Sequence, residues 1–471
     1  SFSNPFYHNQ GKGYLGFASQ TVTGNSTGLT DTYSYNADEN YFYSYLSKLK
    51  STDGTGNDLS EKNVVFSNKS YSYGSYFPFT SRVISKDLLH NTTDTSFYYY
   101  DAYGNDTLTI VKQNGEQATT VNKQFIQKGS WCPAQISEAA ITKSSNGSNP
   151  DYHKYSEYGY DNIGQLVRMA DYVDQSDSLR ISLTYNDFGN ILSKTTSLAD
   201  GNNRTREFDY DTNNRFITDI TQGNLSSSKS HDPATGAVLS ETSINVLTKT
   251  YEYDGFGRST KEEISSTKFL STDYEWSIGS PGNAVYSITQ TDGITENKTY
   301  FDDSGREIRS QGVGFSGDEL LIDKQYSQRG QIIKESKPYF SGGTPAWNVF
   351  SYDTLGRIES LSAYGSNLDY SYDGSTTTTS KSNYGVNRTY SVTLNGLGQI
   401  ASSTQNDKTL NFAYGNNGGI VSVSPPSSGT SLSFSYDSRA MLTEKTDPDM
   451  GTSNFKYNAL GELTNSETAK G

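Results

Sequence analysis

Oxygen-bearing side chains gather at residues 52–61, TDGTGNDLSE, which makes this segment the best candidate for a metal site. Asp53, Asn57 and Asp58 could each offer an oxygen ligand to calcium. The segment lacks the full ligand spacing of an EF-hand loop, and Asp and Asn are also common in tight turns. The sequence therefore favours a solvated turn, and we expect no bound metal.

The residue types that most often carry catalysis are scattered. The histidines are His8, His90, His153 and His231, which are far apart and show no metal-binding spacing. Cys132 is the only cysteine, and its tryptophan and proline neighbours favour a buried small hydrophobe over a nucleophile. No glycine-rich phosphate loop follows a strand and opens a helix. We expect no catalytic residues and no cofactor, so the chain is predicted not to be an enzyme.

Aspartate also recurs in a fixed local phrase, as in SYDTLGRIESLSAYG at residues 351–365. Asp353 has the position of the first residue of a type I turn, and Gly356 that of the fourth. Glycine adopts a left-handed conformation there without a Cβ penalty, and it is the usual residue of a G1 bulge. Residues on both sides alternate between apolar and polar, as in a strand. Each phrase therefore predicts one β-hairpin.

The phrase recurs through residues 160–471, mostly at intervals of 20–26 residues. The repeat residues of the clear copies are Tyr160, Asp161, Gly164, Tyr185, Gly189, Tyr253, Asp254, Gly257, Arg258, Asp302, Gly305, Arg306, Tyr352, Asp353, Gly356, Arg357, Tyr457 and Gly461. Weaker copies begin at Tyr210, His231, Tyr326, Leu394, Tyr414 and Tyr436, a broken copy lies at Tyr372, and a further hairpin is expected near Trp276. Self-similarity at such a period indicates a repeat architecture.

The repeat residues have predicted structural roles. The aspartates stand at turn starts, so capping of the turn explains them better than acid–base chemistry does. The arginines after the glycines, Arg258, Arg306 and Arg357, are expected to bridge to neighbouring hairpins.

An isolated hairpin is only marginally stable, so the hairpins must pair with one another. We predict an all-β protein in which the hairpin repeats form one long antiparallel sheet. Strand twist and regular bulges should coil this sheet into a hollow shell or a spiral. Hydrophobic residues make up only 32% of the chain, but its 37 tyrosines suit strands that lack a dense aliphatic core.

The regularity of the repeat divides the chain into two regions. Residues 1–150 contain aromatic, strand-like runs and are interpreted as irregular first strands of the same sheet, whereas residues 151–471 carry the regular repeats. A separate small β-domain is the alternative, with its boundary in the polar segment 143–151.

The charge and hydropathy of the chain restrict the kinds of partner that it is expected to bind. The net charge of −14 repels phosphate backbones and no basic cluster is present, so we expect no nucleic-acid binding. No apolar run approaches the length of a membrane-spanning segment, so no membrane span is expected either.

The repeated phrase resembles the YD repeat of RHS proteins, and GKGYLGF at residues 11–17 resembles the start of the RHS shell in toxin-complex B components. The resemblance implies a cocoon that encloses a C-terminal toxin or effector cargo, in a bacterial protein that is secreted or displayed at the cell surface. It also implies as partners an N-terminal region and a shell plug outside these residues, and secretion machinery.

One departure from that family concerns self-cleavage. Members that release their cargo end the shell with a region rich in Asp-Pro and Gly-Leu motifs that carries cleaving aspartates. No such region is visible in this sequence, and DPDMG at residues 447–451 resembles it only superficially. Because another repeat follows at once, we interpret this segment as an ordinary turn. The chain is therefore expected to be an internal fragment of a longer protein.

Two function classes remain open. The favoured one is a structural container for a toxin or effector. The alternative is a cell-surface adhesion or carbohydrate-binding module, in which exposed tyrosines would stack on sugars.

Overall fold

The computed structural model describes residues 1–8, 13–25, 27–38, 40–70, 76–128, 132–145, 152–172, 178–197, 203–277, 281–363, 365–383, 385–426, 429–458 and 460–469. These residues form 39 β-strands, and none of them is helical. No helix in this part of the chain could therefore cross a membrane.

The strands have the following bounds in residues 1–231: β1 Phe2–His8, β2 Gly13–Thr23, β3 Thr30–Asp38, β4 Tyr43–Thr52, β5 Asp58–Ser70, β6 Tyr76–Asp87, β7 Thr92–Tyr100, β8 Asp106–Gln113, β9 Gln117–Lys128, β10 Cys132–Ser145, β11 Tyr152–Tyr160, β12 Leu166–Tyr172, β13 Ser178–Tyr185, β14 Ile191–Ser197, β15 Asn203–Tyr210, β16 Ile217–Gln222 and β17 Leu225–His231.

The remaining strands are β18 Val238–Thr242, β19 Thr248–Tyr253, β20 Ser259–Ser265, β21 Lys268–Trp276, β22 Tyr286–Thr291, β23 Glu296–Phe301, β24 Glu307–Val313, β25 Glu319–Tyr326, β26 Ile332–Ser336, β27 Tyr339–Phe340, β28 Trp347–Tyr352, β29 Ile358–Ala363, β30 Ser366–Asp373, β31 Thr376–Asn383, β32 Val386–Leu394, β33 Ile400–Gln405, β34 Lys408–Tyr414, β35 Ile420–Ser424, β36 Leu432–Tyr436, β37 Leu442–Asp447, β38 Gly451–Tyr457 and β39 Leu463–Glu467.

All strands belong to one sheet, in which strands that follow each other in sequence pair antiparallel. The exception is at β25, which pairs with both β26 and β27, while β28 continues the sheet from β26. The hairpin expected near Trp276 is present, because β21 pairs with β22. The pairing of β10 with β11 carries the sheet across residue 150. The predicted all-β fold, a long antiparallel sheet of hairpins, is confirmed.

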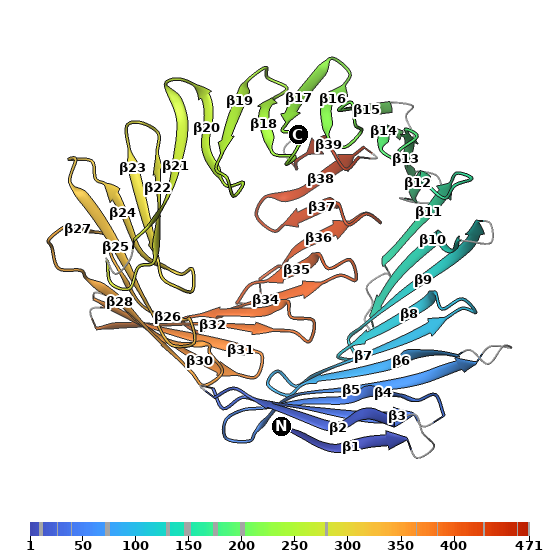
Figure 1. The fold of residues 1–471 in the computed structure, drawn as a ribbon. Helices are drawn as coiled ribbons and strands as arrows, with labels where there is room; N and C mark the ends of the chain where they lie inside the picture. The colour runs from blue at the N-terminus through green and yellow to red at the C-terminus, as the bar shows by residue number, and fades with distance from the viewer. Residues whose placement is uncertain are drawn as a thin grey trace.

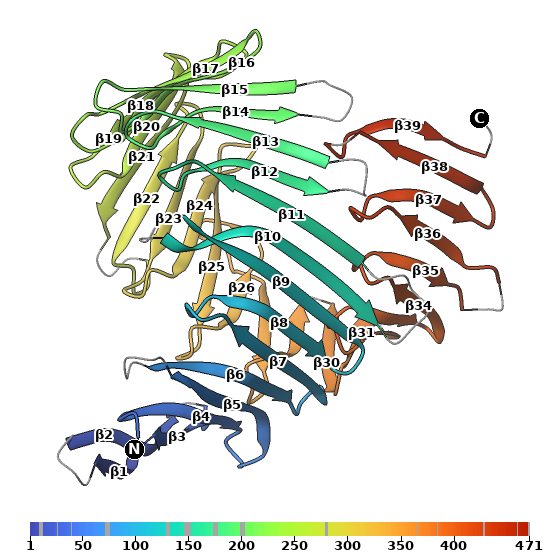
Figure 2. The ribbon, with the colours of Figure 1, turned by 90° about the vertical axis from the view of Figure 1, so that its right-hand side faces the viewer.

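The sheet coils as an open spiral (Figure 1). From the N-terminus it runs up one side, across the top and down the other side, and β30 to β39 then begin a second coil. Figure 2 shows that β34 to β39 lie beside the first coil along the spiral axis. A register shift precedes the motif tyrosine in most hairpins, for example between Ser351 and Tyr352. Such bulges increase the local twist and curvature, as the sequence predicted.

The sheet has no conventional hydrophobic core. Only Ala170, Ala284 and Leu321 are buried hydrophobic residues in the described part of the chain. Many strands alternate between more and less exposed residues, and β30 does so along its whole length. The protein is therefore a wall one layer thick and not a set of compact modules with aliphatic centres.

Candidate functional site

The repeated turn is built around its aspartate, as in the hairpin of β28 and β29. Asp353 accepts hydrogen bonds through Oδ1 from the backbone N–H groups of Leu355 and Arg357, at 3.0 and 2.8 Å. The N–H of Gly356 donates to the carbonyl of Asp353 at 3.0 Å, and the φ of Gly356 is 85°. Gly164, Gly189, Gly257, Gly305 and Gly461 also have positive φ. Positive φ favours glycine at this position, although Asn214 and Ala440 adopt positive φ in the equivalent turns of two weaker copies.

The motif tyrosine connects its hairpin to the preceding one. The hydroxyl of Tyr352 donates to the carbonyl of Ile332, two residues after Gly330, at 2.8 Å. Eight other tyrosines make the same kind of bond at 2.6–2.9 Å, namely Tyr160, Tyr185, Tyr210, Tyr253, Tyr326, Tyr372, Tyr414 and Tyr436. The ring supplies apolar area, while the hydroxyl satisfies a backbone carbonyl of the neighbouring hairpin. The sequence did not predict this bond, because it depends on how consecutive hairpins align.

The motif arginine acts first within its own turn. Its Nε donates to the aspartate of the same turn, at 2.6 Å for Arg258, 2.8 Å for Arg306 and 2.7 Å for Arg357. Each guanidinium also lies over a tyrosine of the next hairpin, at 4.0, 4.8 and 4.1 Å from the ring centroids of Tyr274, Tyr326 and Tyr372 respectively. The expected bridge between hairpins is therefore a cation–π contact, and the ion pair stays inside the turn.

These contacts shift the acidity of the motif residues. Burial alone would raise the pKa of Asp353, but hydrogen bonds from the side chain and backbone of Arg357 hold that pKa below its ordinary value. The same balance, with Arg306 as the donor, lowers the pKa of Asp302, which is only 1% exposed. Burial raises the pKa of the Tyr352 hydroxyl. At neutral pH the turn thus holds a charged carboxylate and a neutral phenol, the forms that its hydrogen bonds require.

The turns also define two rims of the sheet. We call the edge formed by the repeated turns the motif rim; its turns include residues 101–105, 161–165, 186–190, 254–258, 395–399, 415–419 and 458–462. The opposite rim contains the intervening turns, including residues 114–116, 243–247, 292–295, 314–318 and 447–450.

The second coil places its motif rim on the opposite rim of the first coil. The N–H of Gly396 donates to Glu116 at 3.3 Å, and the side-chain amide of Gln117 donates to the carbonyl of Asn416 at 3.3 Å. Further along, the guanidinium of Arg204 donates twice to the carboxylate of Glu462, at 2.8 Å each. We call this the coil contact. It joins residues that are 258–299 positions apart in sequence.

Comparison with known proteins identifies this architecture. No family model matches the sequence. The tRNA3(Ser)-specific nuclease WapA of Bacillus spizizenii (strain DSM 15029 / JCM 12233 / NBRC 101239 / NRRL B-23049 / TU-B-10) is 25% identical over 367 residues, which are 70% of this chain and 14% of that protein. The crystal structure of TcdB2-TccC3 superposes over 100% of this chain with a TM-score of 0.77 at 9% identity. That of TcdB2-TccC3-TEV does so with a TM-score of 0.78 at 8% identity.

The chain has the fold of an RHS shell. It spans 36–38% of the length of the matched chains in these two structures. The resemblance inferred from the YD phrase is thereby confirmed for the fold.

Two other predictions from the sequence concern polar loops. Asp53 accepts hydrogen bonds from Thr55 and Asn57 through both carboxylate oxygens, and Asp58 pairs with Lys50 at 2.8 Å, so this segment is a turn. Asp447 accepts the N–H groups of Asp449 and Met450 between β37 and β38, which is also an ordinary turn.

The histidines are not brought together. His90 binds Asp87, His153 contacts Thr142, and His231 stacks on Phe216 with 5.1 Å between ring centroids. The side chains of His8 and Cys132 lie outside the described residues. Within those residues, no group of three or more His, Cys, Asp or Glu side chains could hold a metal ion.

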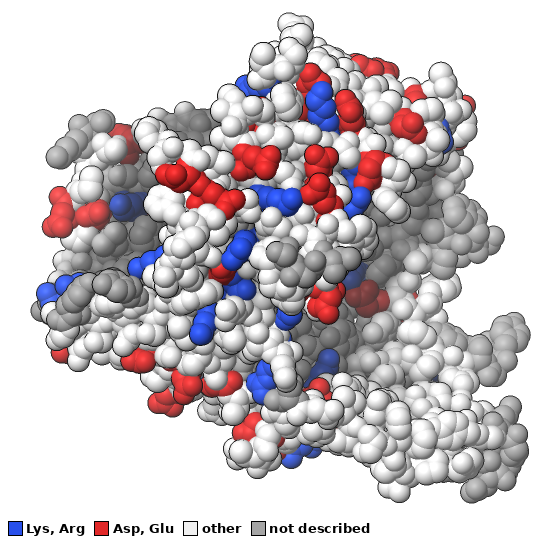
Figure 3. Space-filling view, turned by 60° about the vertical axis from the view of Figure 1, so that its left-hand side comes forward, with Lys and Arg blue, Asp and Glu red and all other residues white. Residues whose placement is uncertain are grey.

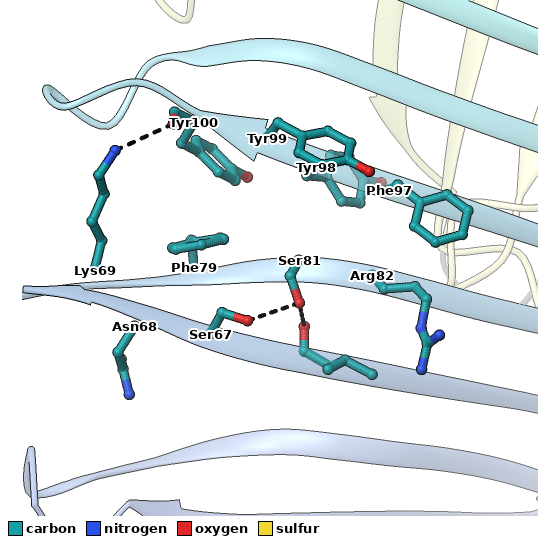
Figure 4. Close-up of a pocket in the computed structure, with 11 residues that line it drawn as sticks. Ser67, Asn68, Lys69, Phe79, Ser81, Arg82, Phe97, Tyr98, Tyr99 and Tyr100 are labelled. Atoms are coloured by element: carbon teal, nitrogen blue, oxygen red, sulfur yellow. Dashed lines mark hydrogen bonds between the residues drawn. The ribbon is translucent and has the colours of Figure 1, made fainter.

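Two aromatic grooves indent the wall. One, about 560 Å³ in volume, is lined by Phe79, Phe97 and Tyr99 together with Lys69, whose ammonium group donates to the carbonyl of Tyr100 at 3.4 Å (Figure 4). The other, about 620 Å³, contains Phe256, Arg258, Tyr274, Trp276 and Tyr286. Phe256 and Trp276 are 88% and 79% exposed. The second groove thus presents large aromatic faces to solvent.

Charged side chains on the wall are of both signs. Figure 3 shows Lys and Arg interspersed with Asp and Glu on the face it displays. Many form ion pairs within the sheet, such as Lys249 with Glu262 on the adjacent strand at 3.0 Å, and Lys298 of β23 with Glu275 of β21, two strands away, at 2.9 Å. These pairs are exposed or half-exposed, so each contributes little to stability.

Proposed function

We propose that this chain is the non-catalytic wall of a container that encloses a polypeptide cargo, a toxin or effector, within a secreted or surface-displayed bacterial protein. The single observation that carries the proposal is a sheet one layer thick that coils until its own rims meet. Such a wall gains little stability from a hydrophobic core. Its repeated Tyr, Asp, Gly and Arg residues instead maintain the curvature of the sheet and the pairing of its hairpins.

The comparisons support the same function. Both similar structures share the RHS-shell fold over the whole of this chain, and the named nuclease is matched over only 14% of its length. In this proposal the match reflects the wall, and the nuclease activity of that protein is not assigned to these residues.

Limited proteolysis tests the container. The product of the complete gene would carry an epitope tag in its C-terminal region and be treated with protease in native buffer and after unfolding in urea. The proposal expects the tag to persist in the native protein and to disappear rapidly after unfolding. Equal rates of digestion in the two states would overturn it.

A carbohydrate-binding function is the second candidate, and the groove of Phe256, Tyr274 and Trp276 is the observation that favours it. Titration of soluble cell-surface polysaccharides, followed by tryptophan fluorescence, tests this function. Saturable quenching that is lost in Trp276→Ala would support it, whereas an identical response of the variant would exclude this groove.

A further inference from the structure

Strands β6 and β7 pair along only part of their length. Their antiparallel register ends at Arg82 and Phe97, and among the described residues no pairing between the two strands continues beyond that point. Residues 77–81 of β6 and 98–100 of β7 therefore diverge toward the motif rim, and we call this gap the open fork. Neither strand lies at an end of the sheet, since β6 also pairs with β5 and β7 also pairs with β8.

Elsewhere the motif tyrosine spans the gap between consecutive hairpins. Tyr185 of β13, for example, donates its hydroxyl to the carbonyl of Leu166 at 2.6 Å, just beyond the end of the β12–β13 pairing. The motif tyrosine of the open fork is Tyr100, whose ring centroid lies 4.9 Å from that of Phe79. Within the described residues its hydroxyl makes no hydrogen bond to β6. Lys69 of β5 donates to the carbonyl of Tyr100 instead, and a groove of about 560 Å³ remains in the fork (Figure 4).

The groove is positively charged although the chain is acidic. Of the described residues that line it, Lys69 and Arg82 are basic and none is acidic, whereas the chain as a whole has a net charge of −14. Arg82 is exposed, and no carboxylate of the described residues forms an ion pair with it. A guanidinium group without an ion pair suits a carboxylate, which it can bind through two parallel hydrogen bonds.

The edges of the open fork favour an extended peptide as the occupant. Where two strands part, the backbone N–H and C=O groups on their facing edges lack a ladder partner, and an added strand can bind them. A sugar or a small anion would leave most of these groups without a partner. Tyr98 and Tyr99 add aromatic surface to the groove, and Tyr99 is 49% exposed. The volume of the groove is typical of sites that enclose a ligand.

We propose that the open fork binds an extended, acidic segment of a partner polypeptide, which adds as a strand to the facing edges of β6 and β7 and places a carboxylate on Arg82. Backbone hydrogen bonds supply affinity, and the rings of Phe79 and Tyr98 pack against alternate apolar side chains of the segment. Arg82 selects for acidic segments. This interaction goes beyond the container function and does not require an enclosed cargo.

Fluorescence anisotropy with labelled pentapeptides tests the proposal on the full chain. The probe is a fluorescein-labelled peptide of alternating valine and glutamate, and the same peptide with glutamine in place of glutamate is its neutral control. The glutamate peptide should bind saturably and at least ~10-fold more tightly than the glutamine peptide, although the net charge of the chain opposes its approach. Methylation of its backbone nitrogens should abolish this binding, because it removes the donors that an added strand needs.

Two arginine variants identify the residue that reads the charge. Arg82→Ala should weaken binding of the glutamate peptide at least ~10-fold and leave binding of the glutamine peptide unchanged. Its matched control is Arg388→Ala, because Arg388 of β32 is likewise exposed and lies outside the groove. The control variant should keep the wild-type preference for the acidic peptide. Since two peptides are compared on the same variant, a small loss of folded protein does not affect the result.

Hydrogen exchange locates the bound peptide. The glutamate peptide should slow amide exchange in residues 77–81 and 98–100. It should leave exchange unchanged in β12 and β13, where Tyr185 spans the corresponding gap.

Four results would overturn the proposal. They are a glutamate peptide that binds no more tightly than the glutamine peptide, a methylated peptide that binds like the unmodified one, an Arg82→Ala variant that keeps the preference for the acidic peptide, and slowed exchange that lies outside the open fork.

Discussion

Arg204 and Glu462 form a two-pronged ion pair across the coil contact, although 258 residues separate them in the sequence. Their side chains are 47% and 49% exposed, so the pair contributes little to stability. Its importance is geometric. It shows that the turn of β38 and β39 lies against the start of β15, which requires the sheet to have completed a full coil.

Glycine substitution in one turn separates backbone conformation from packing. Gly257 has a φ of 79° whereas Gly255 has no positive φ, and a Cβ at either position would meet nothing within 4 Å. Gly257→Ala is expected to lower the free energy of unfolding by roughly 1–2 kcal/mol, because an L-residue is strained there. Gly255→Ala, the matched control, should be neutral or slightly stabilising in the same urea titration. Equal effects of the two variants would show that φ does not decide the cost.

Removing one motif hydroxyl tests the link between hairpins. Tyr352→Phe deletes the hydrogen bond to Ile332 and leaves the ring in place, so unfolding should become easier by about 0.5–1.5 kcal/mol. Tyr390→Phe is the control, since Tyr390 is 45% exposed and its hydroxyl accepts a hydrogen bond from the side chain of Ser403 at 3.3 Å. Hydrogen exchange should increase mainly in the hairpins next to Tyr352. Unchanged stability in Tyr352→Phe would argue against a structural role of the hydroxyl.

Asp302 is the most enclosed of the motif aspartates. It accepts N–H groups from Ser304 and Arg306 through Oδ1, and Nε of Arg306 through Oδ2. Asp302→Ala leaves these donors without an acceptor and should cost about 2 kcal/mol in thermal or urea denaturation. Asp302→Asn keeps an acceptor for the backbone groups and should cost less. An Asn variant as unstable as the Ala variant would mean that the ion pair with Arg306 dominates.

Alkaline pH should weaken the wall through its tyrosines. Burial raises the pKa values of Tyr185, Tyr210, Tyr326, Tyr352 and Tyr436 in the folded state above the unfolded value, which is about 10. The stabilisation is therefore complete below about pH 10 and is lost as pH rises through the higher folded pKa values. Urea midpoints measured across this range should fall, and Tyr185→Phe with Tyr352→Phe should reduce the slope. A flat profile would contradict this assignment.

The local structure could be predicted because each repeat contains the residues that determine its own turn and strands. The spacing from Asp353 to Gly356 fixes a turn, the glycine permits a positive φ, and alternation fixes the flanking strands. These features recur often enough that the all-β sheet, the bulges and the hairpin near Trp276 could be predicted from the sequence.

No local sequence pattern predicts the contacts between the two coils. The pairing of Gln117 with Asn416 depends on curvature summed over many strands, and no short pattern encodes that sum. The exposed position before the motif glycine was not predicted either, because Phe188 and Leu397 occupy equivalent turns and differ only in whether another coil lies beside them. The arginines were predicted to bridge hairpins; Arg357 does so by a cation–π contact with Tyr372, while its hydrogen bond to Asp353 stays inside its own turn, a division that the sequence does not show.

The coiling of the sheet onto itself can be tested with one engineered disulfide. A Cβ at Gly396 would lie 2.9 Å from the Cβ of Asn114, so a small shift gives the separation that a disulfide needs. Asn114→Cys with Gly396→Cys, in a Cys132→Ser background, should oxidise within one molecule, as detected by mass spectrometry of the linked peptides. The control pair, Asn114→Cys with Gly374→Cys, should not, because Gly374 faces Leu89 instead. Failure of the first pair to form under conditions that keep the protein folded would contradict the spiral on which the container depends.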